Sequence, residues 1–158
     1  MMSAGTPQIT NPTQALLKSR IIWGALLLGE VIFLGVILFM RGQEGFRTGP
    51  NEMTWLLVYI AFGLAIIMIP IGSLMRRIIL RRPAGQPAQP QAYLTATIVF
   101  NALCEATALF GLVATLLHHD LFPAIIPTAI AMYVQLRNWP RGYEMLSADP
   151  RFTPMAPS

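Results

Sequence analysis

The chain has 158 residues, of which 54% are hydrophobic and only 11% are charged, whereas about a quarter of the residues of a soluble domain are charged. This composition excludes an ordinary soluble domain and predicts a single all-α integral membrane domain, because helices satisfy their own backbone hydrogen bonds in lipid. The formal net charge is +4. Its basic residues flank the apolar segments and form no aromatic-interleaved patch, so no nucleic-acid partner is expected.

The first predicted span covers residues 21–40, after a polar, proline-containing segment at residues 1–15 that we expect to be a flexible tail. Lys18 and Arg20 precede the span, as in a secretory signal peptide. However, the apolar run has about 20 residues, the length of a membrane-spanning helix, and no small-residue cleavage site follows it. The sequence therefore predicts that the run remains in the protein as its first transmembrane helix.

The second and third predicted spans cover residues 54–75 and 93–117, and a linker rich in proline and glutamine joins them at residues 82–92. Pro70 lies within the second span, where its missing N–H is expected to kink or loosen the helix. The prolines of the linker favour an extended, semi-rigid connector.

The fourth predicted span, residues 121–136, is the shortest and contains Pro123 and Pro127. Its length of about 16 residues is small for a hydrocarbon layer about 30 Å thick. Pro123 suits the first turn of a helix, while Pro127 is expected to distort the helix or shorten its regular part. A polar tail at residues 142–158 follows, and the four spans together predict a four-helix bundle in the membrane.

Basic residues near the ends of the spans predict the orientation of this bundle. The side with both chain termini and the linker has eight of them: Lys18, Arg20, Arg76, Arg77, Arg81, Arg82, Arg137 and Arg141. The opposite side has two, Arg41 and Arg47, which Glu44 and Glu52 offset. Because cytoplasmic loops carry an excess of Lys and Arg, we expect a multi-pass protein of the cell (inner) membrane with both termini in the cytoplasm.

Two carboxylates form the candidate site: Glu30 near the middle of the first predicted span and Glu105 in the middle of the third. Spans one and three run in the same direction, so the two residues are expected at the same depth. A charged side chain at the centre of a span costs several kcal/mol, about 2.5 to 3.5 for Asp, Lys or Arg on insertion scales. We therefore expect neutral, hydrogen-bonded carboxyls, with the polar residues Asn101, Thr97 and Cys104 beside them on the third span.

Three roles for this site remain open from the sequence. The carboxyls hydrogen-bond inside the bundle and specify its packing, in an accessory or structural component of a membrane assembly. Alternatively, Glu30 and Glu105 exchange protons or cations, and the protein translocates or responds to protons. The third role is a contact with another membrane subunit, a second copy of the chain or a ligand.

The segment ALCEATALFGLVATLL, residues 102–117, resembles the carboxylate-bearing helix of the proteolipid c subunits of rotary ATPases. In that family, a helical hairpin with a basic, Gln- and Pro-containing cytoplasmic loop carries a mid-membrane Glu or Asp that takes up and releases the transported ion. The resemblance implies an ion-binding role for Glu105, and it covers only this helix and the character of the loop before it. The chain as a whole looks like the small four-span bacterial membrane proteins that have no assigned function.

The segment RRIILRR contains Arg76, Arg77, Arg81 and Arg82 around one apolar turn, and it is predicted to contact the headgroups of membrane lipids. The HHD sequence at residues 118–120 offers no i, i+4 pair of metal ligands, so neither a metal nor another cofactor is expected. No nucleotide motif or nucleophile–base pair occurs, and we do not expect an enzyme. Cys104 is predicted to be a packed thiol.

Overall fold

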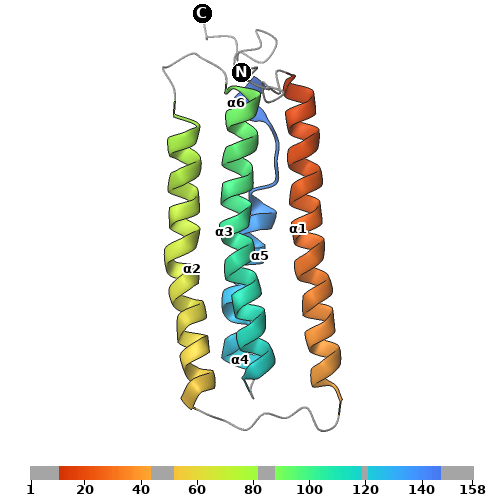
Figure 1. The fold of residues 1–158 in the computed structure, drawn as a ribbon, viewed down its shortest axis with the longest axis vertical. Helices are drawn as coiled ribbons and strands as arrows, with labels where there is room; N and C mark the ends of the chain where they lie inside the picture. Colours follow the sequence, from red (N-terminus) through yellow and green to blue (C-terminus); the bar gives the residue numbers. More distant parts are fainter. Residues whose placement is uncertain (1–10, 44–51, 82–87, 119–120, 147–158) are drawn as a thin grey trace, which may run out of the picture.

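The computed structural model describes residues 11–43, 52–81, 88–118 and 121–146. In these ranges every regular element is a helix (Figure 1). The helices are α1 (Pro12–Arg41), α2 (Glu52–Ile79), α3 (Pro90–Leu117), α4 (Leu121–Ala124), α5 (Ile126–Arg137) and α6 (Tyr143–Leu146).

Three of these helices, α1, α2 and α3, are long and apolar enough to cross a membrane, and they contain the predicted ranges 21–40, 54–75 and 93–117. Half of the most apolar part of α3 is buried within the protein, compared with 17% for α1 and 22% for α2. Figure 1 shows the reason, since α3 lies between α1 and α2 and α5 runs along its far side. The central helix therefore positions the other three.

Helix α1 begins earlier than the sequence indicates. Asn11 caps it by accepting a hydrogen bond from the Thr13 N–H at 2.9 Å, and Pro12 occupies the first helical position, where a missing N–H costs nothing. Ala15 is buried against Tyr93 of α3. Residues 12–15 are therefore the first turn of α1 and not part of a flexible tail, while residues 1–10 lie outside the described residues.

The two prolines on either side of the α2–α3 connection act differently. Pro70 lies inside α2, which continues through it as one helix to Ile79. Pro90 is the first residue of α3, so residues 90–92 of the predicted linker are helical. Residues 82–87 lie outside the described residues.

The expected single helix over residues 121–136 is divided in two. Phe122 has extended backbone angles within α4, and Pro127 falls in the first turn of α5. The regular part, α5, has 12 residues, which corresponds to about 18 Å at 1.5 Å per residue. This length is well below a hydrocarbon thickness of about 30 Å. The shortening agrees with the expected effect of Pro127, which cannot donate a backbone hydrogen bond.

The chain after α5 packs back onto the end of the helices where α1 and α3 begin. The Gly142 N–H donates to the hydroxyl of the buried Tyr93 at 3.2 Å, and the Ala88 N–H donates to the Glu144 carbonyl at 2.8 Å. Met145 completes a small apolar cluster with Ala88 and Tyr93. The chain at Gly142, Glu144 and Met145 is therefore held against the helices and is not part of a flexible tail. Residues 147–158 lie outside the described residues.

Replacing Gly142 by alanine should weaken this packing. Gly142 has a φ of 76°, in the left-handed region that costs other residues about 1–2 kcal/mol, and an added Cβ would lie 3.1 Å from the Leu16 Cδ1. We expect the free energy of unfolding in detergent to fall by about 1–2 kcal/mol. The matched control is Gly63→Ala, because a Cβ at Gly63 meets no atom within 4 Å. Equal stability of the two variants would contradict the prediction.

Candidate functional site

The Glu30 carboxyl lies inside the protein, where α1 meets α5. The residue is 1% exposed. In the amide orientation that satisfies both groups, the Gln135 Nε2 donates to both Glu30 carboxyl oxygens at 3.0 Å. The backbone carbonyl of Gln135 accepts a hydrogen bond from the Trp23 Nε1 at 3.0 Å. Glu30 and Trp23 of α1 therefore both bind Gln135, and through it they hold the end of α5 against α1.

Asn101 of α3 lies at the level of this contact. The Thr128 hydroxyl of α5 donates to the Ala108 carbonyl of α3 at 3.0 Å, and the two helices run in opposite directions (Figure 1). Gln135 is about two turns after Thr128, and Asn101 is about two turns before Ala108. Gln135 and Asn101 therefore lie at one level on the facing sides of α5 and α3. The buried Asn101 amide makes no hydrogen bond within the described residues.

Two further predicted residues, Thr97 and Cys104, lie on the same buried face of α3 as Asn101. Cys104 is fully buried and is a free thiol. Within the described residues the Thr97 hydroxyl makes no hydrogen bond of good geometry. These side chains line the interior of the bundle, so none of them is presented to a ligand at the surface.

Glu105 has a different environment, because it is only half-buried. Steps of four residues advance about 40° around a helix, so the series Thr97, Asn101, Glu105 moves from the buried face to its edge. The adjacent face of α3 has exposed residues both around Glu105 and toward its two ends, while Leu109 and Phe110 are half-buried. The exposed residues are Gln91, Thr95, Ile98, Ala102, Ala106, Val113 and Leu117. No N–H or O–H donor of the described residues bonds to the Glu105 carboxyl.

The two glutamates nevertheless lie at a similar depth. Helices α1 and α3 run in the same direction (Figure 1). Ala15 packs against Tyr93 at one end, and at the other the Arg41 Nη1 donates to the carbonyl of His118 at 2.6 Å. This register places Glu30 and Glu105 within about one turn of each other along the bundle. The two carboxyls therefore share a depth, and Glu105 is close enough to act electrostatically on Glu30. They differ in their contacts, because Gln135 seals Glu30 while Glu105 lies at the edge of an uncovered face.

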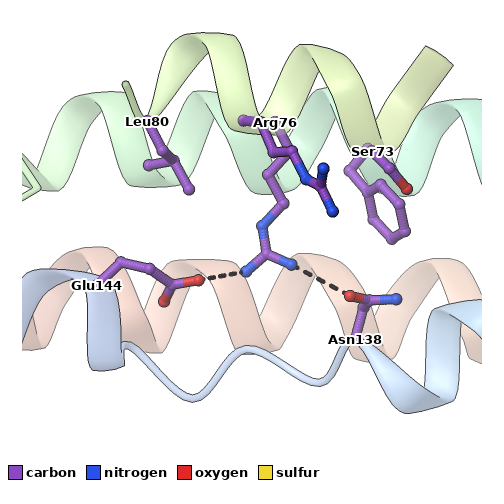
Figure 2. Close-up of a pocket in the computed structure, with 7 residues that line it drawn as sticks. Ser73, Arg76, Leu80, Asn138 and Glu144 are labelled. Atoms are coloured by element: carbon purple, nitrogen blue, oxygen red, sulfur yellow. Dashed lines mark hydrogen bonds and ion pairs between the residues drawn. The ribbon is translucent and has the colours of Figure 1, made fainter. Parts of the chain in front are cut away.

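The predicted headgroup arginines divide into two groups. Arg76 turns toward the chain after α5, where its Nη2 lies 2.7 Å from the Glu144 Oε1 and its Nη1 donates to the Asn138 Oδ1 at 3.2 Å (Figure 2). Arg77 and Arg81 are exposed, and Arg82 lies outside the described residues. Arg76 therefore joins α2 to the chain after α5.

Sequence reasoning missed Gln135, although a signal for it exists. Pro127, Thr128, Ala131 and Gln135 follow the spacing of one helical face, and all four are buried. A polar amide that ends such a face in an apolar segment is a candidate partner for a buried carboxyl. Arg41 was also assigned only to topology, yet it hydrogen-bonds the carbonyls of Thr115 and His118 at the end of α3.

In the part of the chain that the structure describes, no group of three or more His, Cys, Asp or Glu side chains is placed to hold a metal ion.

Comparisons with protein-family models, with curated proteins and with solved structures found no match for this chain. Its functional assignment therefore depends on the arrangement of its own residues.

Proposed function

We propose that this chain is a small, non-enzymatic, polytopic membrane protein that acts as an accessory or structural component of a membrane assembly. The observation that supports this proposal is the position of Glu105, half-buried at the edge of the face of α3 that no other described helix covers. The partner, another subunit or a second copy of the chain, places a helix along this face.

The physical reason is the cost of a polar side chain in hydrocarbon. Glu105 lies near the middle of a helix with the length and hydropathy of a membrane span, where an unpaired polar group is unfavourable by several kcal/mol. A hydrogen-bond donor on a partner helix would remove this cost. The neighbouring exposed residues, Ala102 and Ala106, are small, and small residues allow membrane helices to approach closely.

Topology forms the second part of the proposal. The broken segment of α4 and α5 crosses the membrane as a short fourth span, so that both termini lie in the cytoplasm and the bundle has four membrane segments in the inner membrane. The excess of basic residues at the end where α1 begins and α2 ends supports this orientation.

Proton or cation translocation is the second candidate. A carboxyl at the edge of a helix and at mid-depth is accessible to a partner that delivers an ion, as the resemblance of residues 102–117 to the proteolipid c subunits implies. In this alternative Glu105 is the ion-binding group, while Glu30 is held by Gln135.

Photo-crosslinking in native membranes tests the proposal. A photoreactive residue replaces Ala106 on the uncovered face, and the control replaces Ile66, which is 71% exposed on α2. We expect one discrete protein adduct from position 106, at twice the mass of the chain for self-association, and its loss in Glu105→Leu because the polar contact is removed. Crosslinks to lipid alone from both positions would contradict the assembly role.

A flux measurement separates the two candidates. The purified protein is reconstituted in vesicles, and proton movement is followed with an internal pH indicator for the wild type and for Glu105→Gln. The accessory role predicts the same slow leak for both proteins. A pH-dependent flux in the wild type that Glu105→Gln abolishes would establish the translocation role instead.

A further inference from the structure

A basic pocket of about 350 Å³ lies between the end of α2 and the chain that follows α5. Arg76, Arg137 and Arg141 line it together with Trp139 and Tyr143. A second pocket of about 440 Å³ shares Arg76, Asn138 and Glu144 with the first (Figure 2), and Arg77 also lines it. Guanidinium groups from two separate parts of the chain therefore converge on one surface.

The first pocket has an excess of positive charge, because three arginines and one glutamate line it. Glu144, its carboxylate, is paired with Arg76 at 2.7 Å, so it offers little repulsion to an anion. Arg137 and Arg141 are exposed, and within the described residues neither makes an ion pair. The planar guanidinium binds phosphate oxygens through two parallel hydrogen bonds, which makes this pair suited to a phosphate group.

The pocket also lies where lipid headgroups would be found. Arg20, Arg76 and Arg137 each stand directly beside an apolar run. Two of them bond to the chain after α5, since the Arg20 Nε donates to the Pro140 carbonyl at 3.3 Å and Arg76 binds the Asn138 side chain. Exposed aromatic residues such as Trp139 and Tyr143 are typical of the membrane–water interface.

We propose that this pocket binds the phosphate group of an anionic phospholipid headgroup. Arg137 and Arg141 bind the phosphate oxygens, the Arg76–Glu144 ion pair forms the back of the pocket, and Trp139 and Tyr143 flank the upper acyl region. A lipid is favoured over a soluble phosphate because a headgroup at this level is held by its chains beside the apolar surfaces of α2 and α5. The site is independent of Glu105 and of the assembly role.

Binding is measured on the purified protein in a neutral detergent, with native mass spectrometry and the shift of the unfolding temperature as readouts. The probes are phosphatidylglycerol, phosphatidylcholine and inorganic phosphate. We expect phosphatidylglycerol to raise the unfolding temperature and to bind at least about tenfold more tightly than phosphatidylcholine. Arg137→Gln/Arg141→Gln should weaken its binding by at least about tenfold, because charge-assisted hydrogen bonds are lost.

The matched control for the single variants Arg137→Gln and Arg141→Gln is Lys18→Gln, which removes the same charge from an exposed residue outside both pockets. This control should change phosphatidylglycerol binding by less than about threefold. Arg137→Lys/Arg141→Lys keeps both positive charges and controls for a folding defect in the glutamine variants. It should fold like the wild type and bind phosphatidylglycerol with intermediate affinity. Equal losses of phosphatidylglycerol affinity in Lys18→Gln and in the single arginine variants, or equal binding of phosphatidylcholine, would overturn the site. Equal protection by inorganic phosphate would overturn its assignment to a lipid.

Discussion

Replacing Gly111 by alanine is expected to lower the free energy of unfolding by about 1–3 kcal/mol, the range for overpacking of a close contact. An added Cβ would lie 2.5 Å from the Thr128 Oγ1 and 3.1 Å from the Thr128 backbone N. The second contact is with backbone, so rotation of a side chain cannot relieve it. Helix α5 would have to move away from α3 and lengthen the bond from Thr128 to the Ala108 carbonyl.

A matched glycine in α1 provides the control for this prediction. A Cβ at Gly35 meets no atom within 4 Å, and alanine is favoured over glycine inside a helix by about 1 kcal/mol. Gly35→Ala should therefore leave the stability unchanged or raise it, as measured by thermal unfolding in detergent. If Gly111→Ala were as stable as Gly35→Ala, the close approach of α3 and α5 would be wrong.

The three long helices were predictable because each depends on its own composition. An apolar run of about 20 residues must form a helix in lipid, whatever its neighbours are. The beginning of α1 was not predictable in this way, since residues 12–15 are polar or small and become helical through the Asn11 cap and the packing of Ala15 against Tyr93. A local cap and one tertiary contact together decided this boundary.

The candidate site was predicted in part for a similar reason. The positions of Glu30 and Glu105 along their helices gave a common depth, but the side of the helix that each presents depends on the packing of α3 between α1, α2 and α5. The hydrogen-bond partner of Glu30 is Gln135, which is far away in the sequence. Such a distant partner can be predicted only when the register of α5 against α1 is known.

The contact between Glu30 and Gln135 leads to the second large prediction. Gln135→Leu leaves the buried carboxyl without its donor, and loss of one partner of a buried hydrogen bond costs about 1–3 kcal/mol. Glu30→Leu/Gln135→Leu should recover much of that loss, because both polar groups are removed together. Glu30→Gln should lose less stability than Gln135→Leu, because its side-chain carbonyl still accepts from the Gln135 amide and only one of the two acceptor oxygens is replaced. Thermal unfolding of these proteins and of the single variant Glu30→Leu in detergent completes the double-mutant cycle and measures the coupling.

These variants also distinguish a packing role for Glu30 from an ion-binding role. If the carboxyl serves only to hold α5, Glu30→Gln keeps most of the stability and the crosslinked adduct from position 106. If Glu30 exchanges a proton, the same variant is stable but changes the pH dependence of flux or of assembly, because an amide cannot titrate. A loss of stability in Glu30→Gln as large as that in Gln135→Leu would contradict both roles, since the amide preserves the shape of the side chain and one of its two acceptors. The stability and the pH dependence of Glu30→Gln therefore determine the role of Glu30. Neither measurement requires the partner of Glu105 to be identified.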